Sequence, residues 1–301
     1  MTAVYLWVPF TLLAAFAQVL RNAFQSRLTG HIGTAGGTQV RFVYGLPFAV
    51  MFLAGYLALS GDALPMPAPG ALAWSAAGAM AQIAATAFML QVMAKRDFGV
   101  AYAYIKTEPV TVALLGLVLV GDNLPLFGWV AVLIVTVGVV MASLRKGDGA
   151  ADLAEWRPLV VGVAAGALFG LSAICFRASI EAVGEGGFLL RSLMMLVVTL
   201  SIQTLAMVGW FFVRDASAFT GSVRHWKLSV PAGALGAVAS AGWFIAFSLT
   251  IAANVRTLAL IEMPVVAIVS RYVSGRWLSA REWTGFVLIT LGVALLMLVH
   301  A

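Results

Sequence analysis

The stretch EPVTVALLGLV at residues 108–118 has a counterpart in MPVVAIVSRYV at residues 263–273, about half of the 301-residue chain later. Glu108 opens the first stretch and Glu262 directly precedes the second. Each half of the chain therefore carries a carboxylate close to a proline inside an apolar segment. This correspondence predicts an internal repeat, in which two copies of one structural unit follow each other.

The repeat extends downstream of these stretches. Trp129 and Gly138 correspond to Trp283 and Gly292 at a constant offset of 154 residues. The two prolines are 155 residues apart, and a one-residue gap near Gly121 reconciles the two offsets.

The composition is that of a membrane protein. The sequence is 62% hydrophobic and 10% charged, with a mean hydropathy of +1.01, which leaves no room for a sizeable soluble domain. The first apolar run, residues 4–20, lacks the basic start and the cleavage site of a signal peptide, so we interpret it as a retained span. A single cysteine, Cys175, excludes an intrachain disulfide and a multi-thiolate metal site. The net charge of +6 lies in short loops, which favours a role in topology over nucleic-acid binding.

Charged and Pro/Gly-rich breaks divide the chain into ten apolar stretches. Each has about the 20 residues that a bilayer core of about 30 Å requires. We therefore predict an all-α polytopic membrane protein with ten transmembrane helices. The predicted spans are 4–26, 37–59, 71–93, 98–120, 126–144, 158–180, 187–213, 228–251, 254–275 and 281–299.

The longest charged segment, residues 145–157, separates the spans into two sets of five. We predict a first five-helix repeat at 1–147 and a second at 148–301. Because five is odd, the second copy enters the membrane from the opposite face, so the repeats are inverted. Basic residues concentrate in and beside the odd-numbered loops, which places these loops in the cytoplasm and both termini outside. The predicted location is the inner (plasma) membrane.

An inverted repeat with a carboxylate and a proline at membrane depth in each half is typical of secondary transporters. Pro109 and Pro264 each remove a backbone hydrogen bond, so we expect their helices to kink or break beside a cavity. The predicted mechanism is alternating access around a fixed site. Its expected partners are a small-molecule substrate, membrane lipids and protons as a candidate coupling ion.

Glu108 and Glu262 are candidate site residues. A carboxylate at membrane depth costs roughly 2.5–3.5 kcal/mol, so it must pair, take up a proton or bind a ligand. A structural ion pair is the alternative. Lys106 is too close along the chain to share a helical face with Glu108, which leaves Arg41 and Arg191 as candidate partners across helices.

Polar and aromatic side chains complete the candidate cavity. Tyr104 shares a helical face with Glu108 at a spacing of four residues. Gln82 and Thr86 form a polar stripe on the third span, with interhelical hydrogen bonding as the alternative role. Trp243 lies deeper than the tryptophans expected at the interfaces and is the candidate aromatic platform.

Five other polar residues are assigned to helix ends. We expect Arg21, Asn22 and Arg27 to reach toward the cytoplasmic interface. Asn254 and Arg256 are expected to form a loop and a helix cap.

The stretch GALFGLSA at residues 166–173 resembles the opening helix of an EamA repeat in the drug/metabolite transporter superfamily. Arg41 and Arg191 match a recurrent arginine of that family, and Glu108-Pro109 resembles its later helices. The resemblance covers the whole chain as two tandem repeats. It implies an exporter of amino acids or similar small metabolites and does not specify the substrate.

The chain departs from the family pattern at two places. The acidic residue after the fourth helix is displaced to Asp122 in one half and replaced by Arg276 in the other. The first helix lacks the usual Trp-Gly pattern, so the resemblance carries no site residue onto that helix.

Other function classes stay open. The substrate could instead be a nucleoside, a sugar or a drug-like cation, and a lipid-modifying transferase or a non-transporting scaffold are alternatives from other classes. The sequence contains no HExxH, GxSxG or paired-aspartate metal motif, and no phosphate-binding lysine accompanies its glycine spacings. We therefore predict no enzyme activity, no cofactor, no metal and no nucleic-acid partner, with a monomer or weak dimer as the assembly.

Overall fold

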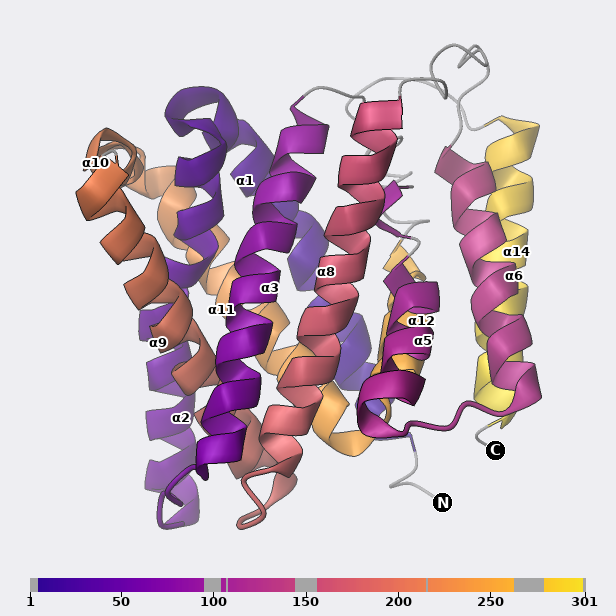
Figure 1. Ribbon diagram of the computed structural model, residues 1–301, viewed down its shortest axis with the longest axis horizontal. Coiled ribbons are helices and arrows are strands. Elements are labelled where there is room, and N and C mark those ends of the chain that lie inside the picture. Colours follow the sequence, from indigo (N-terminus) through magenta and orange to yellow (C-terminus); the bar gives the residue numbers. More distant parts are fainter. Residues whose placement is uncertain are drawn as a thin grey trace.

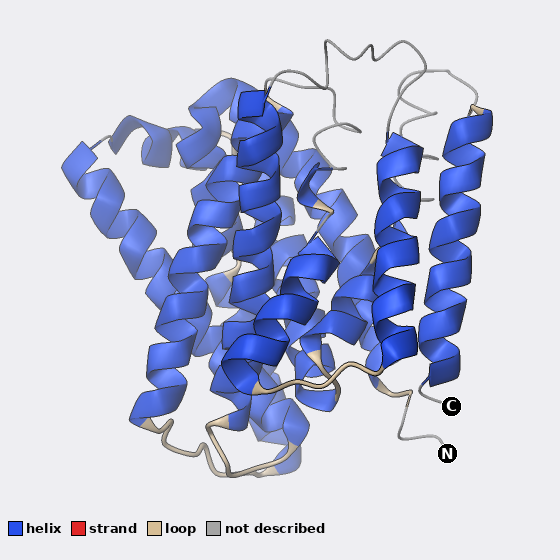
Figure 2. Cartoon of the chain, turned by 45° about the vertical axis from the view of Figure 1, so that its right-hand side comes forward, coloured by secondary structure: helices blue, strands red, loops and turns tan. Residues whose placement is uncertain are grey.

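The computed structural model describes residues 5–94, 104–106, 108–143, 156–214, 216–262 and 279–299. All regular structure in these residues is helical, and Figures 1 and 2 show the helices packed side by side. The all-α prediction is therefore confirmed for this part of the chain. The helices are α1 (Trp7–Val43), α2 (Leu46–Ser60), α3 (Pro69–Met93), α5 (Glu108–Val120), α6 (Leu126–Ser143), α8 (Trp156–Glu181), α9 (Phe188–Arg214), α10 (Ala216–Arg224), α11 (Trp226–Leu249), α12 (Ala252–Ala259) and α14 (Ala280–Val299).

Within the described residues, five helical stretches are long and apolar enough to cross a membrane. Their length and composition support a membrane-embedded chain, as the sequence predicted. Three shorter helical stretches are also apolar. The long stretches are Trp7–Ser60, Pro69–Met93, Val160–Glu181, Phe188–Val213 and Trp226–Leu249, and the shorter ones are Glu108–Val120, Leu126–Gly138 and Trp283–Leu295.

A break was predicted at residues 27–36, and the chain does bend there, but the residues on both sides of the bend are helical. α1 continues through it but folds back at Gly33, whose φ of 71° is readily adopted by glycine. The Nε2 atom of Gln25 donates to the carbonyl oxygen of Gly37 at 2.8 Å, so the two arms of α1 lie side by side. α1 thus consists of two helical arms joined at the bend of Gly33, and Figure 1 shows it leading on into α2.

α1 packs along α11, and α3 packs along α8. These two pairs contribute much of the contact between helices. A Cβ atom added at Gly242 of α11 would lie 2.8 Å from the Cβ of Ala14 in α1. A Cβ atom added at Gly78 of α3 would lie 2.6 Å from a ring atom of Phe176 in α8. Small residues at such contacts let membrane helices approach closely. Each pair joins a helix from the first half of the chain to one from the second.

α6 and α14 cross through a reciprocal glycine contact. A Cβ atom added at Gly138 would lie 2.7 Å from the carbonyl oxygen of Gly285, and one added at Gly292 would lie 3.0 Å from that of Ala131. A late residue of each helix thus faces an early residue of the other, so the helices are antiparallel. Figure 1 shows them as a pair at one side of the molecule.

Two shorter helices, α5 and α12, pack on each other, and α5 also packs on α8 while α12 packs on α1. α5 begins at Glu108, so Pro109 lies in the first turn, where its missing N–H is tolerated. α12 begins after the extended residues Thr250 and Ile251. The first residue of each helix is buried, Glu108 in α5 and Ala252 in α12.

Candidate functional site

Two buried ion pairs connect the two halves of the chain near α5 and α12. The Nε atom of Arg256 lies 3.0 Å from Oε1 of Glu108. The Nζ atom of Lys106 forms an ion pair with Oε1 of Glu262. All four side chains are 5% exposed or less. Each carboxylate is therefore paired with a cation from the other half.

This pairing differs from the partners that the sequence suggested. Glu108 pairs with Arg256 and not with Arg41 or Arg191. Each ion pair makes the other half necessary to neutralise a buried charge, because leaving one partner of a buried pair without the other typically costs about 3–5 kcal/mol.

Arg256 lies inside α12, where a loop and a cap were expected. Its guanidinium carbon is 4.6 Å from the centroid of the Trp243 ring and 5.3 Å from that of Phe247. These two rings, one turn apart on α11, stack with their centroids 6.4 Å apart. The expectation failed because the break after α11 is short and α12 packs directly on α5 and α1. The aromatic platform predicted at Trp243 thus lies against an arginine of the protein itself, a favourable cation–π arrangement.

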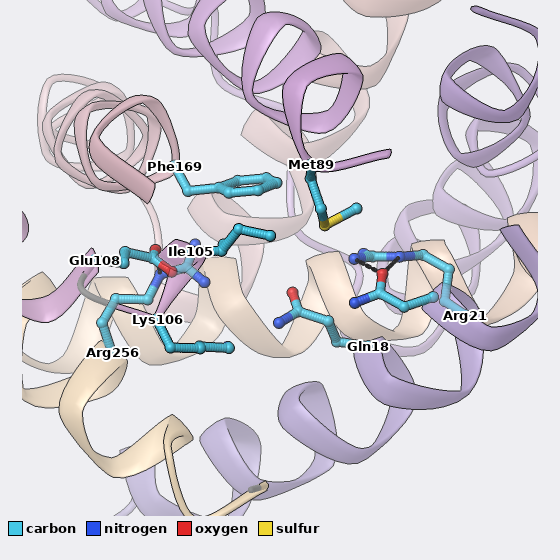
Figure 3. A pocket seen from close by; sticks show the side chains of 9 residues that line it. Gln18, Arg21, Met89, Ile105, Lys106, Glu108, Phe169 and Arg256 are labelled. Atoms are coloured by element: carbon cyan, nitrogen blue, oxygen red, sulfur yellow. Dashed lines mark hydrogen bonds and ion pairs between the residues drawn. The ribbon is translucent and has the colours of Figure 1, made fainter. Parts of the chain in front are cut away.

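A small cavity lies beside the ion pairs (Figure 3). The space open to the centre of a water-sized sphere is about 20 Å³, enough for one water molecule. Figure 3 shows Lys106, Glu108 and Arg256 at one end, Arg21 at the other and Gln18 between them. The lining residues are Gln18, Arg21, Asn22, Met89, Ile105, Lys106, Glu108, Phe169 and Arg256.

Arg21 and Asn22 lie in the interior, which corrects the expectation that they reach toward the interface. They are 1% and 2% exposed, and Nη2 of Arg21 donates to Oδ1 of Asn22 at 2.8 Å. The reason is that α1 extends beyond its predicted end to the bend at Gly33, so that these residues lie well inside a helix packed along α11. Arg27, expected at the same interface, is exposed.

A second polar cluster joins other predicted residues. Arg41 donates from Nη1 to Oγ1 of Thr86 at 3.0 Å. Gln203 of α9 donates from Nε2 to Oε1 of Gln82 at 2.9 Å. These are interhelical hydrogen bonds, the alternative role that the sequence left open for Gln82 and Thr86. None of the four residues is among those that line the cavity.

Two further candidates lie away from the cavity lining. Tyr104 packs against Val92, and the helical face that was expected to join it to Glu108 is interrupted by a turn before α5. Arg191 lies in the first turn of α9 and is not among the lining residues. Pro264 lies outside the described residues.

A second cavity follows one helical turn farther along α1 and α3. By the same measure its volume is about 250 Å³. Ser26 stands one turn after Asn22 and Met93 one turn after Met89, so the two cavities lie in succession between these helices. The second cavity is lined by Ser26, Thr29, Gly30, Leu90, Met93 and Ala94.

The buried charges of the described residues are unequal in sign. Four are cations and two are carboxylates, namely Arg21, Arg41, Lys106 and Arg256 against Glu108 and Glu262. An excess of one sign is unfavourable in a low-dielectric interior. Within the same residues, no group of three or more His, Cys, Asp or Glu is arranged to hold a metal ion.

Comparison with known proteins gives a likeness in fold. No family model and no curated protein matches the chain. Twenty-eight chains of solved structures match it in fold. One of them, described only as the crystal structure of a protein, has a TM-score of 0.68 at 17% sequence identity, over 99% of this chain and 97% of that chain. At this identity the likeness shows the fold alone.

Proposed function

We propose that the protein is a secondary active transporter that exports amino acids or similar small polar metabolites across the inner membrane by alternating access. Two buried ion pairs carry this proposal: Arg256 with Glu108, and Lys106 with Glu262. They lie beside a cavity between the two halves of the chain. Ionisable residues inside membrane segments usually mark substrate or ion pathways. A site between two repeats is also where secondary transporters bind their substrates.

The crossing of α6 and α14 supports an inverted repeat. The offset of 154 residues relates Gly138 to Gly292 and Ala131 to Gly285. When each residue is replaced by its counterpart in the other half, the contact of Gly138 with Gly285 becomes the contact of Gly292 with Ala131. A two-fold axis perpendicular to the antiparallel helices produces this exchange, and such an axis is the relation between inverted repeats.

The other helix pairs agree with repeat units at 1–147 and 148–301. By the repeat, α1 corresponds to α8 and α11 corresponds to α3. The pair α1–α11 therefore corresponds to the pair α8–α3, and both pairs are closely packed. Ten spans follow if Trp7–Ser60 crosses twice by folding back at Gly33, and if α5, α6, α14 and the segment that begins with α12 cross once each. On this proposal the chain is an EamA-like member of the drug/metabolite transporter superfamily.

The ion pairs suggest how the halves could move. Rocking of one half against the other would break and reform both pairs, because each pair joins opposite halves. Uptake of a proton by Glu108 would release Arg256, so protons are the candidate coupling ion. The cavity beside them has room for about one water, so a substrate requires the halves to separate. The second cavity then lies on the route from the predicted cytoplasmic loops.

Uptake by proteoliposomes under an imposed pH gradient tests this function. We expect amino acids or similar small polar metabolites to accumulate, and we expect the double variant Glu108→Gln/Arg256→Gln to be inactive. A panel of amino acids, nucleosides, sugars, organic acids and organic cations identifies the class. Uptake of another class alone would replace the amino-acid proposal, and uptake of no class would contradict transport.

The predicted topology can be tested by thiol labelling in intact cells. Single cysteines are introduced at Asp62 and at Ala150 on a Cys175→Ala background. With both termini outside and the linker in the cytoplasm, an impermeant maleimide is expected to label position 62 and not position 150. Labelling at position 150 without labelling at 62 would show that the orientation is reversed.

A further inference from the structure

We propose that the transported compound is a small organic anion and that Arg256 binds its carboxylate or phosphate group in place of Glu108. This inference rests on the proposed transport function and specifies its substrate class. A net negative charge distinguishes such a substrate from a zwitterionic amino acid.

The sign of the buried charge favours an anion. Among the described residues, four buried cations stand against two buried carboxylates. Both carboxylates already have a cation as partner. A cationic ligand would increase the positive excess and a neutral ligand would leave it unchanged, whereas an anion would offset it and lower the cost of burying these charges.

Arg256 has the geometry to exchange one anion for another. Its planar guanidinium carries five N–H donors, which suit a carboxylate or a phosphate group. The rings of Trp243 and Phe247 lie against it and restrict its position. Arg256 and Glu108 both line the cavity, so a ligand that enters when the halves separate meets the guanidinium beside the carboxylate with which it competes.

Trp243 provides an independent observation. Its side chain is 3% exposed, and its Nε1 atom has no hydrogen-bond partner among the described residues. A buried donor without an acceptor is unfavourable and uncommon. Arg256 lies over the face of this ring, with its guanidinium carbon 4.6 Å from the centroid, so an oxyanion bound to Arg256 would come close to Trp243.

Uptake into proteoliposomes separates the substrate class from transport itself. Four probes have four carbons each and differ in charge: succinate is an anion, threonine a zwitterion, putrescine a cation and erythritol neutral. Glycerol 3-phosphate tests a phosphate group. We expect uptake of succinate or of glycerol 3-phosphate. Uptake of only threonine, putrescine or erythritol would leave the transporter in place and overturn the anion proposal. Uptake of none of the five would overturn the anion proposal, and the wider panel described above then decides whether the protein transports another class or none.

Binding to variants tests the role of Arg256. In Glu108→Gln the competing carboxylate is absent, so the transported anion is expected to bind about tenfold more tightly. The double variant Glu108→Gln/Arg256→Gln has no charge left at this pair and is expected to bind the anion at least about tenfold more weakly than wild type. Affinity is taken from the rise in Tm as a function of anion concentration. Arg27→Gln, which removes an exposed arginine outside the cavity lining, is the control and should bind as wild type does.

A purely structural ion pair gives the opposite results. Anion binding by the double variant with wild-type affinity would overturn the proposal, because Arg256 would then have no role in binding. Weaker binding by Glu108→Gln would overturn it as well, because Glu108 would then assist the anion and not compete with it.

Discussion

Replacing Glu108 with glutamine is expected to lower the free energy of unfolding by about 3–5 kcal/mol. Glutamine keeps the shape of the side chain but not its charge. Arg256, which is 5% exposed, would therefore remain buried without its carboxylate. Reversible unfolding of the detergent-solubilised protein by SDS measures the change.

A double variant tests whether the unpaired charge of Arg256 causes this loss of stability. Glu108→Gln/Arg256→Gln removes both charges, and its stability should lie closer to wild type than that of Glu108→Gln, because neutral replacement of a buried pair is often tolerated. If the double variant is as unstable as the single one, the unpaired arginine is not the cause.

The chain offers a matched control in a more exposed ion pair. Asp122 pairs with Arg177, and their side chains are 13% and 17% exposed. Asp122→Asn is expected to cost less than Glu108→Gln, because Arg177 is more exposed than Arg256 and keeps a second partner, Glu181, at 2.9 Å. A loss equal to that of Glu108→Gln would contradict the importance that we assign to burial.

Helix ends with local signals could be predicted from the sequence. Gly61 ends α2 in the left-handed conformation and Pro69 begins α3, and both residues lie at a predicted break. The sequence predicted a break between the first two spans, at residues 27–36, but not a bend at Gly33 with helix on both sides. The bend depends on one glycine and on the contact of Gln25 with Gly37, which neither hydropathy nor local composition reveals.

The buried carboxylates could be predicted, but their partners could not. Glu108 and Glu262 stand out because an acid in an apolar segment is rare. Lys106 was weighed only against Glu108 on its own helix, and Arg256 was assigned to a cap because it follows a break. Both pairings are tertiary contacts between halves, which periodicity along one helix cannot show. The repeat did contain a usable signal. Lys106 is close to Glu108 in the sequence and Arg256 is close to Glu262, and each cation could have been considered as a partner for the carboxylate of the other half.

Gly138→Ala and Gly292→Ala are each expected to destabilise the protein by about 1–3 kcal/mol. An added Cβ atom would lie 2.7 Å from the carbonyl oxygen of Gly285 in the first variant and 2.4 Å from a side-chain carbon of Val135 in the second, so α6 and α14 would have to separate. Gly55→Ala in α2 is the matched control, since no atom lies within 4 Å of its added Cβ. It should be neutral or stabilising by up to about 1 kcal/mol. SDS unfolding again measures the three changes.

The double variant Gly138→Ala/Gly292→Ala tests the inverted repeat that we propose. A two-fold axis through the crossing places both contacts on the same pair of backbones, so the first substitution opens the gap that the second must enter. The combined loss should then fall short of the sum by more than the about 0.3–0.5 kcal/mol within which independent sites add. Additive losses would mean that the two contacts act separately, and the crossing would no longer support a two-fold relation between the halves.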